Sequence, residues 1–193
     1  MIDIALDRFP VRYTLSTGAE CILRPLLAKD EAAFQSFQQS VQEKERFLIK
    51  HRITGDEQLH EWCQNLDYES NLPLLALAEG AIVGYATLHQ RPGGWKRHIG
   101  MVSALIQPEF RGVGVLRFLL EELVNVARHS GLTRLEAEFN GERKNTIASF
   151  GKCGFVELVR LPDYLQDMEA QPHDYVLMGL NLMTDIEYTG AGD

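Results

Sequence analysis

The stretch from Ile106 to Leu116 carries the residues whose types and spacing point most directly to chemistry. It reads Ile-Gln-Pro-Glu-Phe-Arg-Gly-Val-Gly-Val-Leu and joins a short apolar run, residues 99–106, to an amphipathic segment. Glycines let the backbone approach a ligand without a Cβ in the way. The first-turn amides of a helix have no intrahelical partner and lie at the positive end of its dipole. An Arg-Gly-x-Gly turn in this position therefore predicts an anion site, most naturally for a phosphate or pyrophosphate.

Two common phosphate-binding motifs do not account for this turn. A P-loop needs a lysine directly after its second glycine, and the chain has none there. A dinucleotide fingerprint needs Gly-x-Gly-x-x-Gly followed by an acid about 20 residues later. Gly112, Gly114 and Glu136 fit that pattern, but Arg117 occupies the third glycine position. The order x-Pro-x-aromatic-Arg-Gly-x-Gly instead resembles the coenzyme A pyrophosphate loop of the GCN5-related N-acetyltransferase (GNAT) family, with Leu116 in place of the last small residue.

The elements that must position this turn follow from hydrophobic periodicity. They predict an α/β (α+β) fold, and the resemblance to the GNAT family implies a central mixed, mostly antiparallel sheet of about seven strands with about four helices on its faces. Strands are expected at residues 13–15, 20–26, 72–78, 82–89, 98–106, 133–139, 155–161 and 174–182. Helices are expected from residue 30 to about residue 41 and at residues 56–65, 112–129 and 143–152, and residues 42–55 are ambiguous. We expect one domain over residues 1–183 and a flexible tail over residues 184–193.

This order of elements resembles the GNAT fold over nearly the whole chain. Two further motifs support the resemblance: the opening Arg24-Pro25-Leu26-x-x-x-Asp30, and the late Ile147-x-x-Phe150-x-Lys152-x-Gly154-Phe155. The resemblance implies an enzyme that transfers an acetyl group from acetyl-CoA to a primary amine of a small molecule, peptide or protein, without a metal. A homodimer is compatible with it.

The resemblance also implies roles for particular residues. Main-chain N–H groups of Ala104, Leu105 and Ile106 would hold the thioester carbonyl. The pyrophosphate would bind the amides of Arg111, Gly112, Val113, Gly114, Val115 and Leu116. The late helix would contribute Asn145, Phe150 and Lys152 to coenzyme binding.

The acid and the base remain open at this point. The family's usual acid is a tyrosine at the position of Phe150, so Tyr164, Cys153 or a water would serve, or the thiolate leaves unassisted. Glu136 and Glu138 share one face of a strand beside the coenzyme strand. Glu138 is the first candidate base, because it lies nearer the strand end that should open on the ligand, and His98 is the alternative. The missing hydroxyl also allows a second function class, a catalytically weak or inactive acyl-CoA-binding module with a regulatory role.

A polar cluster follows the late helix. It comprises Asp163, Tyr164, Asp167, His173 and Asp174. These side chains either cap turns or line the acceptor pocket.

Composition sets the remaining expectations. The chain has 193 residues and a formal net charge of −8, which argues against general nucleic-acid binding and allows a cationic acceptor. No apolar run approaches the roughly 20 residues of a membrane span, and no signal peptide is expected. Cys21, Cys63 and Cys153 fit neither a disulfide framework nor a zinc site, so a cytoplasmic location is expected.

Overall fold

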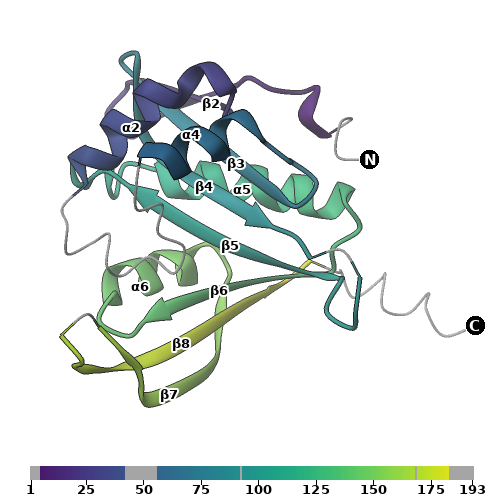
Figure 1. Cartoon of the computed structure of the whole chain (residues 1–193), viewed down its shortest axis with the longest axis vertical. Helices are drawn as coiled ribbons and strands as arrows, with labels where there is room; N and C mark the ends of the chain where they lie inside the picture. The colour runs from purple at the N-terminus through teal and green to yellow at the C-terminus, as the bar shows by residue number, and fades with distance from the viewer. Residues whose placement is uncertain (1–4, 42–55, 92, 168, 183–193) are drawn as a thin grey trace, which may run out of the picture.

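The computed structural model describes residues 5–41, 56–91, 93–167 and 169–182 (Figure 1). The ambiguous segment 42–55 and the expected tail at residues 184–193 lie outside these residues. The extent of the domain therefore stays a prediction at its carboxyl end.

The described residues form one eight-stranded sheet with the order β1-β2-β3-β4-β5-β6-β8-β7. All neighbouring strands are antiparallel except β5 and β6, which are parallel. The expected mixed, mostly antiparallel sheet is confirmed, and each of its eight strands overlaps one of the segments where a strand was expected. The strands are β1 (Val11–Thr14), β2 (Glu20–Pro25), β3 (Asn71–Ala78), β4 (Ala81–His89), β5 (Ile99–Ile106), β6 (Arg134–Asn140), β7 (Val156–Gln166) and β8 (Pro172–Asn181).

Helices cover both faces of the sheet. The described residues form α2 (Glu31–Ser40), α4 (Asp56–Gln64), α5 (Val115–His129) and α6 (Lys144–Lys152), with 3-10 turns η1 (Ala28–Asp30) and η2 (Pro108–Phe110). Leu74 belongs to a core that includes α5 and Phe150 of α6, whereas its neighbour Leu75 packs with α2 and α4. Successive strand residues point to opposite faces, so α5 and α6 cover one face and α2 and α4 the other (Figure 1).

Helix α5 begins three residues later than the sequence pattern indicates. Gly112 and Gly114 have φ angles of 77° and 111°, and Gly114 is the N-cap of the helix. A residue with positive φ cannot continue a right-handed helix. The two glycines therefore form a turn before the helix. The first-turn amides of α5, which have no intrahelical partner, lie directly after this turn.

One acidic residue of α5 departs from the helical pattern. Helical spacing predicts that Glu122 lies on the polar face with Glu121, which is wrong, because its side chain is fully buried. Arg8 covers it with Nη2 3.1 Å from Oε1, and the Tyr13 hydroxyl donates to the same oxygen. The other oxygen, Oε2, has no hydrogen-bond partner among the described residues. Helical periodicity could not show that the chain before and within β1 folds over this side of α5.

Replacing Tyr13 by phenylalanine is expected to lower the free energy of unfolding by about 1.5–3 kcal/mol, because a buried carboxylate loses a hydrogen bond. The ring can keep its stacking on Phe118, 4.2 Å away, so the change isolates the hydroxyl. Urea unfolding measures the difference. Tyr164→Phe is the matched control, since Tyr164 is 66% exposed and should change stability by less than about 0.5 kcal/mol. Equal effects of the two substitutions would contradict the prediction.

Candidate active site

Strands β5 and β6 pair only at one end and then diverge. Their registered pairs run from Ile99↔Arg134 to Met101↔Glu136, although β5 continues to Ile106 and β6 to Asn140. Figure 1 shows the two strands separating beyond this ladder. In the described part of the chain, no strand pairs with this edge of β5 after Met101. Its main-chain polar groups are therefore placed to bond a ligand that enters the opening.

A cavity of about 520 Å³ lies at this opening, a size typical of small-molecule sites. Met101 and Ser103 line it from one face of β5, and Val102 and Ala104 line it from the other face. A cavity that contacts both faces of one strand passes around the strand's edge. The space therefore connects the α2/α4 face of the sheet with the α5/α6 face through the gap between β5 and β6.

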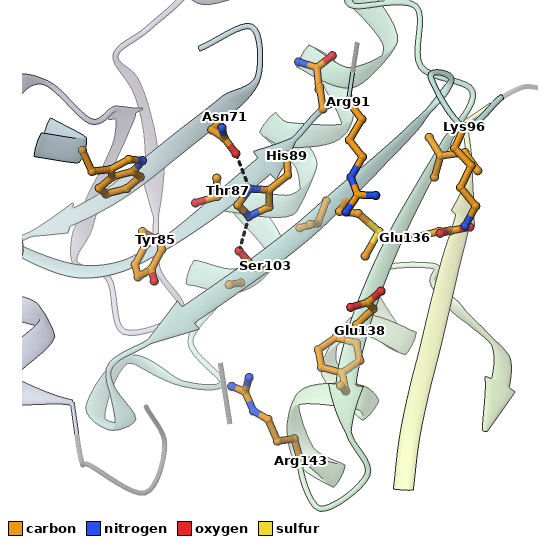
Figure 2. Close-up of a pocket in the computed structure, with 17 residues that line it drawn as sticks. Asn71, Tyr85, Thr87, His89, Arg91, Lys96, Ser103, Glu136, Glu138 and Arg143 are labelled. Carbon is orange, nitrogen blue, oxygen red and sulfur yellow. Dashed lines mark hydrogen bonds between the residues drawn. The ribbon is translucent and has the colours of Figure 1, made fainter. Parts of the chain in front are cut away.

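Two carboxylates project into this cavity from β6, as Figure 2 shows. Glu136 is only 7% exposed and lies opposite Met101, at the closed end of the gap. Glu138 lies two residues further along, where the strands have separated. The Tyr175 hydroxyl hydrogen-bonds to Glu138; burial, followed by the charge of Glu138, raises the pKa of Tyr175 to about 12. Tyr175 therefore stays protonated at neutral pH and fixes the Glu138 side chain.

A row of three hydrogen-bonded side chains crosses β3, β4 and β5 on the same face of the sheet (Figure 2): Asn71, His89 and Ser103. We call it the histidine row, because His89 is its central member. His89 Nδ1 lies 2.7 Å from Asn71 Oδ1, and His89 Nε2 lies 3.0 Å from Ser103 Oγ. All three residues line the cavity. His89 is not among the candidate residues that the sequence motifs indicate. The available signal was the alternation along residues 82–89, which puts His89 on the same strand face as Tyr85 and Thr87.

The two ends of the cavity carry positive charge. In Figure 2, Arg91 and Lys96 enter from one end and Arg143 from the other. Near Arg143 the ring of Tyr85 packs edge-on against Phe34, with 5.0 Å between centroids, and burial raises the pKa of Tyr85 to about 12. The cavity thus has two carboxylates at its centre and three basic groups toward its ends.

The Arg-Gly-x-Gly turn lies at the end of β5. The Ser16 amide donates to the Val113 carbonyl at 3.1 Å and ties the turn to the β1–β2 connection. Arg111 Nε donates to the Ile106 carbonyl at 3.1 Å, so this side chain folds back on the end of the strand. A Cβ at Gly112 would meet no atom within 4 Å, whereas a Cβ at Gly114 would lie 3.1 Å from the Phe118 ring.

Helix α6 places the other expected coenzyme residues. Asn145 and Lys152 are exposed. Phe150 is fully buried, with its ring 4.9 Å from the Phe139 ring and 5.1 Å from the Phe155 ring, edge-on to both. Phe150 is therefore a core residue, and its side chain has no polar group that could bond a ligand.

The structure does not bring the alternative acid and base into the cavity. His98 is exposed in the turn before β5, and its carbonyl accepts the Thr133 amide at 3.0 Å. Tyr164 is exposed on β7, with its ring 5.6 Å from the Tyr175 ring. Neither residue lines the cavity formed by the described residues.

The polar cluster after α6 shapes a turn. Asp167 Oδ1 accepts the amides of Glu169 and Gln171, each at 2.9 Å, and Oδ2 lies 2.9 Å from His173 Nε2. Hydrogen bonding to His173, followed by that to the Gln171 amide, holds the pKa of Asp167 below its usual value. None of the five members lines the cavity described above.

No helix among the described residues is long and apolar enough to cross a membrane. No group of three or more His, Cys, Asp or Glu side chains among them is arranged to hold a metal ion.

Two known proteins are similar in sequence to parts of this chain. The chain is 30% identical over 102 residues to a putative phosphinothricin acetyltransferase of Bacillus subtilis, covering 53% of this chain and 61% of that one, which is less than two thirds. It is 29% identical over 121 residues to an aminoglycoside N(6')-acetyltransferase of Stenotrophomonas maltophilia, covering 60% of this chain and 79% of that one.

A similar fold is found in a solved structure. It is the putative acetyltransferase yncA from Salmonella typhimurium with its cofactor acetyl-CoA, with a TM-score of 0.72 at 20% identity, covering 85% of this chain and 95% of that one. The model of the acetyltransferase (GNAT) family matches residues 35–155, more than half of the chain. The chain therefore belongs to the acetyltransferase (GNAT) family.

Proposed function

We propose that this protein is an N-acetyltransferase, which moves the acetyl group of acetyl-CoA to a primary amine of a small molecule, peptide or protein. The observation that carries the proposal is the cavity at the β5/β6 divergence, which joins a carboxylate-lined side to the side that carries the helix α5. Such a passage lets a thioester meet an amine while each substrate approaches from its own face of the sheet.

The coenzyme would bind on the α5/α6 face. The amides of Ala104, Leu105 and Ile106, along the open edge of β5, would hold the thioester carbonyl and stabilise negative charge on its oxygen. The amides of residues 111–116 would hold the pyrophosphate at the N-terminus of α5. Asn145 and Lys152 would contact the coenzyme from α6, and Phe150 would support that surface from the core.

The amine would enter on the α2/α4 face, where Glu136 and Glu138 project into the cavity. Glu138 would remove the proton of the amine, directly or through a water, because it lies where the strands have opened. The nearby Glu136 would attract the ammonium form of the acceptor. A thiol has a reference pKa of roughly 8.5, so the thiolate can leave without a protein acid or with a water as donor.

The reaction would take place in the cytoplasm. Cys21, Cys63 and Cys153 are all free thiols. Free cysteines persist in a reducing compartment.

Turnover of acetyl-CoA with a panel of amines tests the proposal. We expect release of free coenzyme A that depends on the amine, with the acetylated amine as the product. Coenzyme binding without transfer to any amine of the panel would instead favour the second candidate, a coenzyme-binding module with a regulatory role. The buried Phe150 favours that candidate, because it leaves the usual acid position without a hydroxyl.

Gly114→Val is expected to weaken coenzyme binding at least tenfold, or about 1.4 kcal/mol. Gly114 has φ of 111°, which a β-branched residue scarcely adopts. The new Cβ would also meet Phe118. The turn would have to rearrange, so its amides would no longer point together toward the pyrophosphate. Titration calorimetry with acetyl-CoA measures the affinity.

Gly131→Val is the matched control for the glycine substitution. Gly131 also has a positive φ, 78°, but it follows the other end of α5, and a Cβ there would meet nothing within 4 Å. Equal coenzyme affinity of Gly114→Val, Gly131→Val and the wild type, all folded, would refute binding through this turn.

A further inference from the structure

We propose that Ser103 takes the acetyl group from acetyl-CoA and passes it to water when no amine is bound, with His89 as the base and Asn71 as the residue that positions His89. This activity, hydrolysis of the thioester through an acetyl-serine, goes beyond direct transfer to an amine. It rests on the proposed binding of acetyl-CoA at the β5/β6 opening.

The first support is the row of hydrogen bonds across three strands. Asn71 on β3 and His89 on β4 are registered opposite each other, and Ser103 on β5 lies diagonally next to His89. The spacings of 2.7 Å and 3.0 Å along the row are within hydrogen-bond range. Because each residue lies on a paired strand, the backbone holds the three side chains more rigidly than a loop would.

The second support is the direction of these hydrogen bonds. The Asn71 oxygen can only accept, so His89 Nδ1 carries the proton and donates it. Nε2 is then unprotonated in the neutral ring and faces the Ser103 hydroxyl, which donates to it. A hydroxyl bonded to an imidazole that a third group orients is the arrangement by which proteins activate a nucleophile.

The third support is the place of Ser103 in the opening. The β5/β6 ladder ends at Met101, so Ser103 lies two residues inside the divergence and on the cavity side of the strand. Its neighbour Ala104 begins the edge that would hold the thioester carbonyl. With the coenzyme bound as proposed, the Ser103 oxygen would therefore lie near the carbon that it attacks, on the face from which an amine would otherwise approach.

The chemistry balances without any further reactant than water. Ser103 Oγ bonds to the thioester carbon while its proton passes to His89 Nε2. The C–S bond then breaks, and the leaving thiolate takes that proton to become the free thiol of coenzyme A. A water next attacks the acetyl-serine and gives a proton to Nε2. The ester C–O bond breaks, Ser103 Oγ recovers the proton, and acetic acid leaves.

Five charged side chains line the same cavity as the histidine row. They are Arg91, Lys96, Glu136, Glu138 and Arg143. Imidazole acts as a base only in its neutral form, so hydrolysis should fall at acid pH. An amine bound by the carboxylates would exclude water and intercept the acetyl group, which confines hydrolysis to the enzyme without acceptor.

The test follows the full-length protein with acetyl-CoA in the absence of any amine. We expect release of free thiol and, after an acid quench, a peptide containing Ser103 that has gained the mass of one acetyl group. Ser103→Ala and His89→Gln should each lower thiol release at least tenfold. Ser36→Ala is the control, because Ser36 is an exposed residue of α2 whose hydroxyl bonds the Ala32 carbonyl.

The positioning role of Asn71 is tested by the pH profile of thiol release, which would not shift if Asn71 only stabilised the fold. Asn71→Leu removes the acceptor of Nδ1–H and should lower thiol release. Asn71→Asp keeps the acceptor and adds a negative charge, so it should retain the activity and shift the acid limb of the pH profile upward, because the carboxylate favours the imidazolium. An unshifted profile would refute the positioning role.

Calorimetry separates the two proposals. Wild-type protein that binds acetyl-CoA, but releases thiol only at the buffer rate and forms no adduct, would overturn hydrolysis and leave the coenzyme site intact. Ser103→Ala with undiminished thiol release would overturn it as well. Absence of coenzyme binding would overturn both proposals together.

Discussion

Replacing Glu138 by glutamine is expected to slow acetyl transfer to an amine by about 10²–10⁴-fold, the usual contribution of an acid–base group. Glutamine keeps the size of the side chain and can still accept the hydrogen bond of Tyr175, but it cannot take a proton. Coenzyme affinity should not change, because the amides of the turn are untouched. Steady-state kinetics and calorimetry on the same preparation measure the two quantities.

Glu136→Gln is the matched control, since it makes the same chemical change on the same strand face. Glu136 lies at the closed end of the gap, opposite Met101, two residues before the strands separate. It should affect acceptor binding, seen as a higher KM, more than kcat. Full activity of Glu138→Gln across the pH range, or a larger loss of kcat in Glu136→Gln, would place the base elsewhere.

The order of elements and the turn before α5 were predictable because their signals are local. Apolar alternation marks strands, and two glycines separated by one residue mark a turn that ordinary residues cannot adopt. The structure gives both Gly112 and Gly114 positive φ and puts the helix directly after them. The shared face of Glu136 and Glu138 is likewise a property of one strand, and both carboxylates do line the cavity.

The histidine row was not predictable in the same way, because it depends on which strands are neighbours. His89 is 18 residues from Asn71 and 14 residues from Ser103. Only the sheet order brings these three side chains together. The same reason accounts for Glu122, whose burial depends on Arg8 and Tyr13, 114 and 109 residues away.

The divergence of β5 and β6 also lies beyond sequence patterns. The two strands are parallel and are connected through α5, so no hairpin turn fixes their register. Each strand has an ordinary apolar pattern up to its end. Nothing in either pattern indicates that pairing stops after Met101, yet this stop creates the cavity. Sequence reasoning could therefore name side chains of the site but not the space between them.

Phe150→Ala is expected to lower the free energy of unfolding by about 3–5 kcal/mol, the usual cost of truncating a buried phenylalanine. Phe150 is fully buried, and the rings of Phe139 and Phe155 pack against it edge-on. A cavity there cannot close without moving both neighbours. Phe150→Leu keeps most of the volume, so it should cost less and should lower the transfer rate only modestly. Urea unfolding and steady-state kinetics measure the two effects.

Phe150→Tyr distinguishes a core residue from a catalytic one. A hydroxyl added to a side chain that is fully buried needs a partner, and without one it costs about 1–3 kcal/mol. We expect this variant to be less stable than the wild type and no faster in transfer. A variant that keeps full stability and transfers faster would show that the ring edge reaches the coenzyme. In that case the chain would have lost only a hydroxyl from a working acid site.

A Phe150→Leu variant that binds the coenzyme normally but loses several orders of magnitude in rate would lead to the same conclusion, since packing alone cannot account for such a loss.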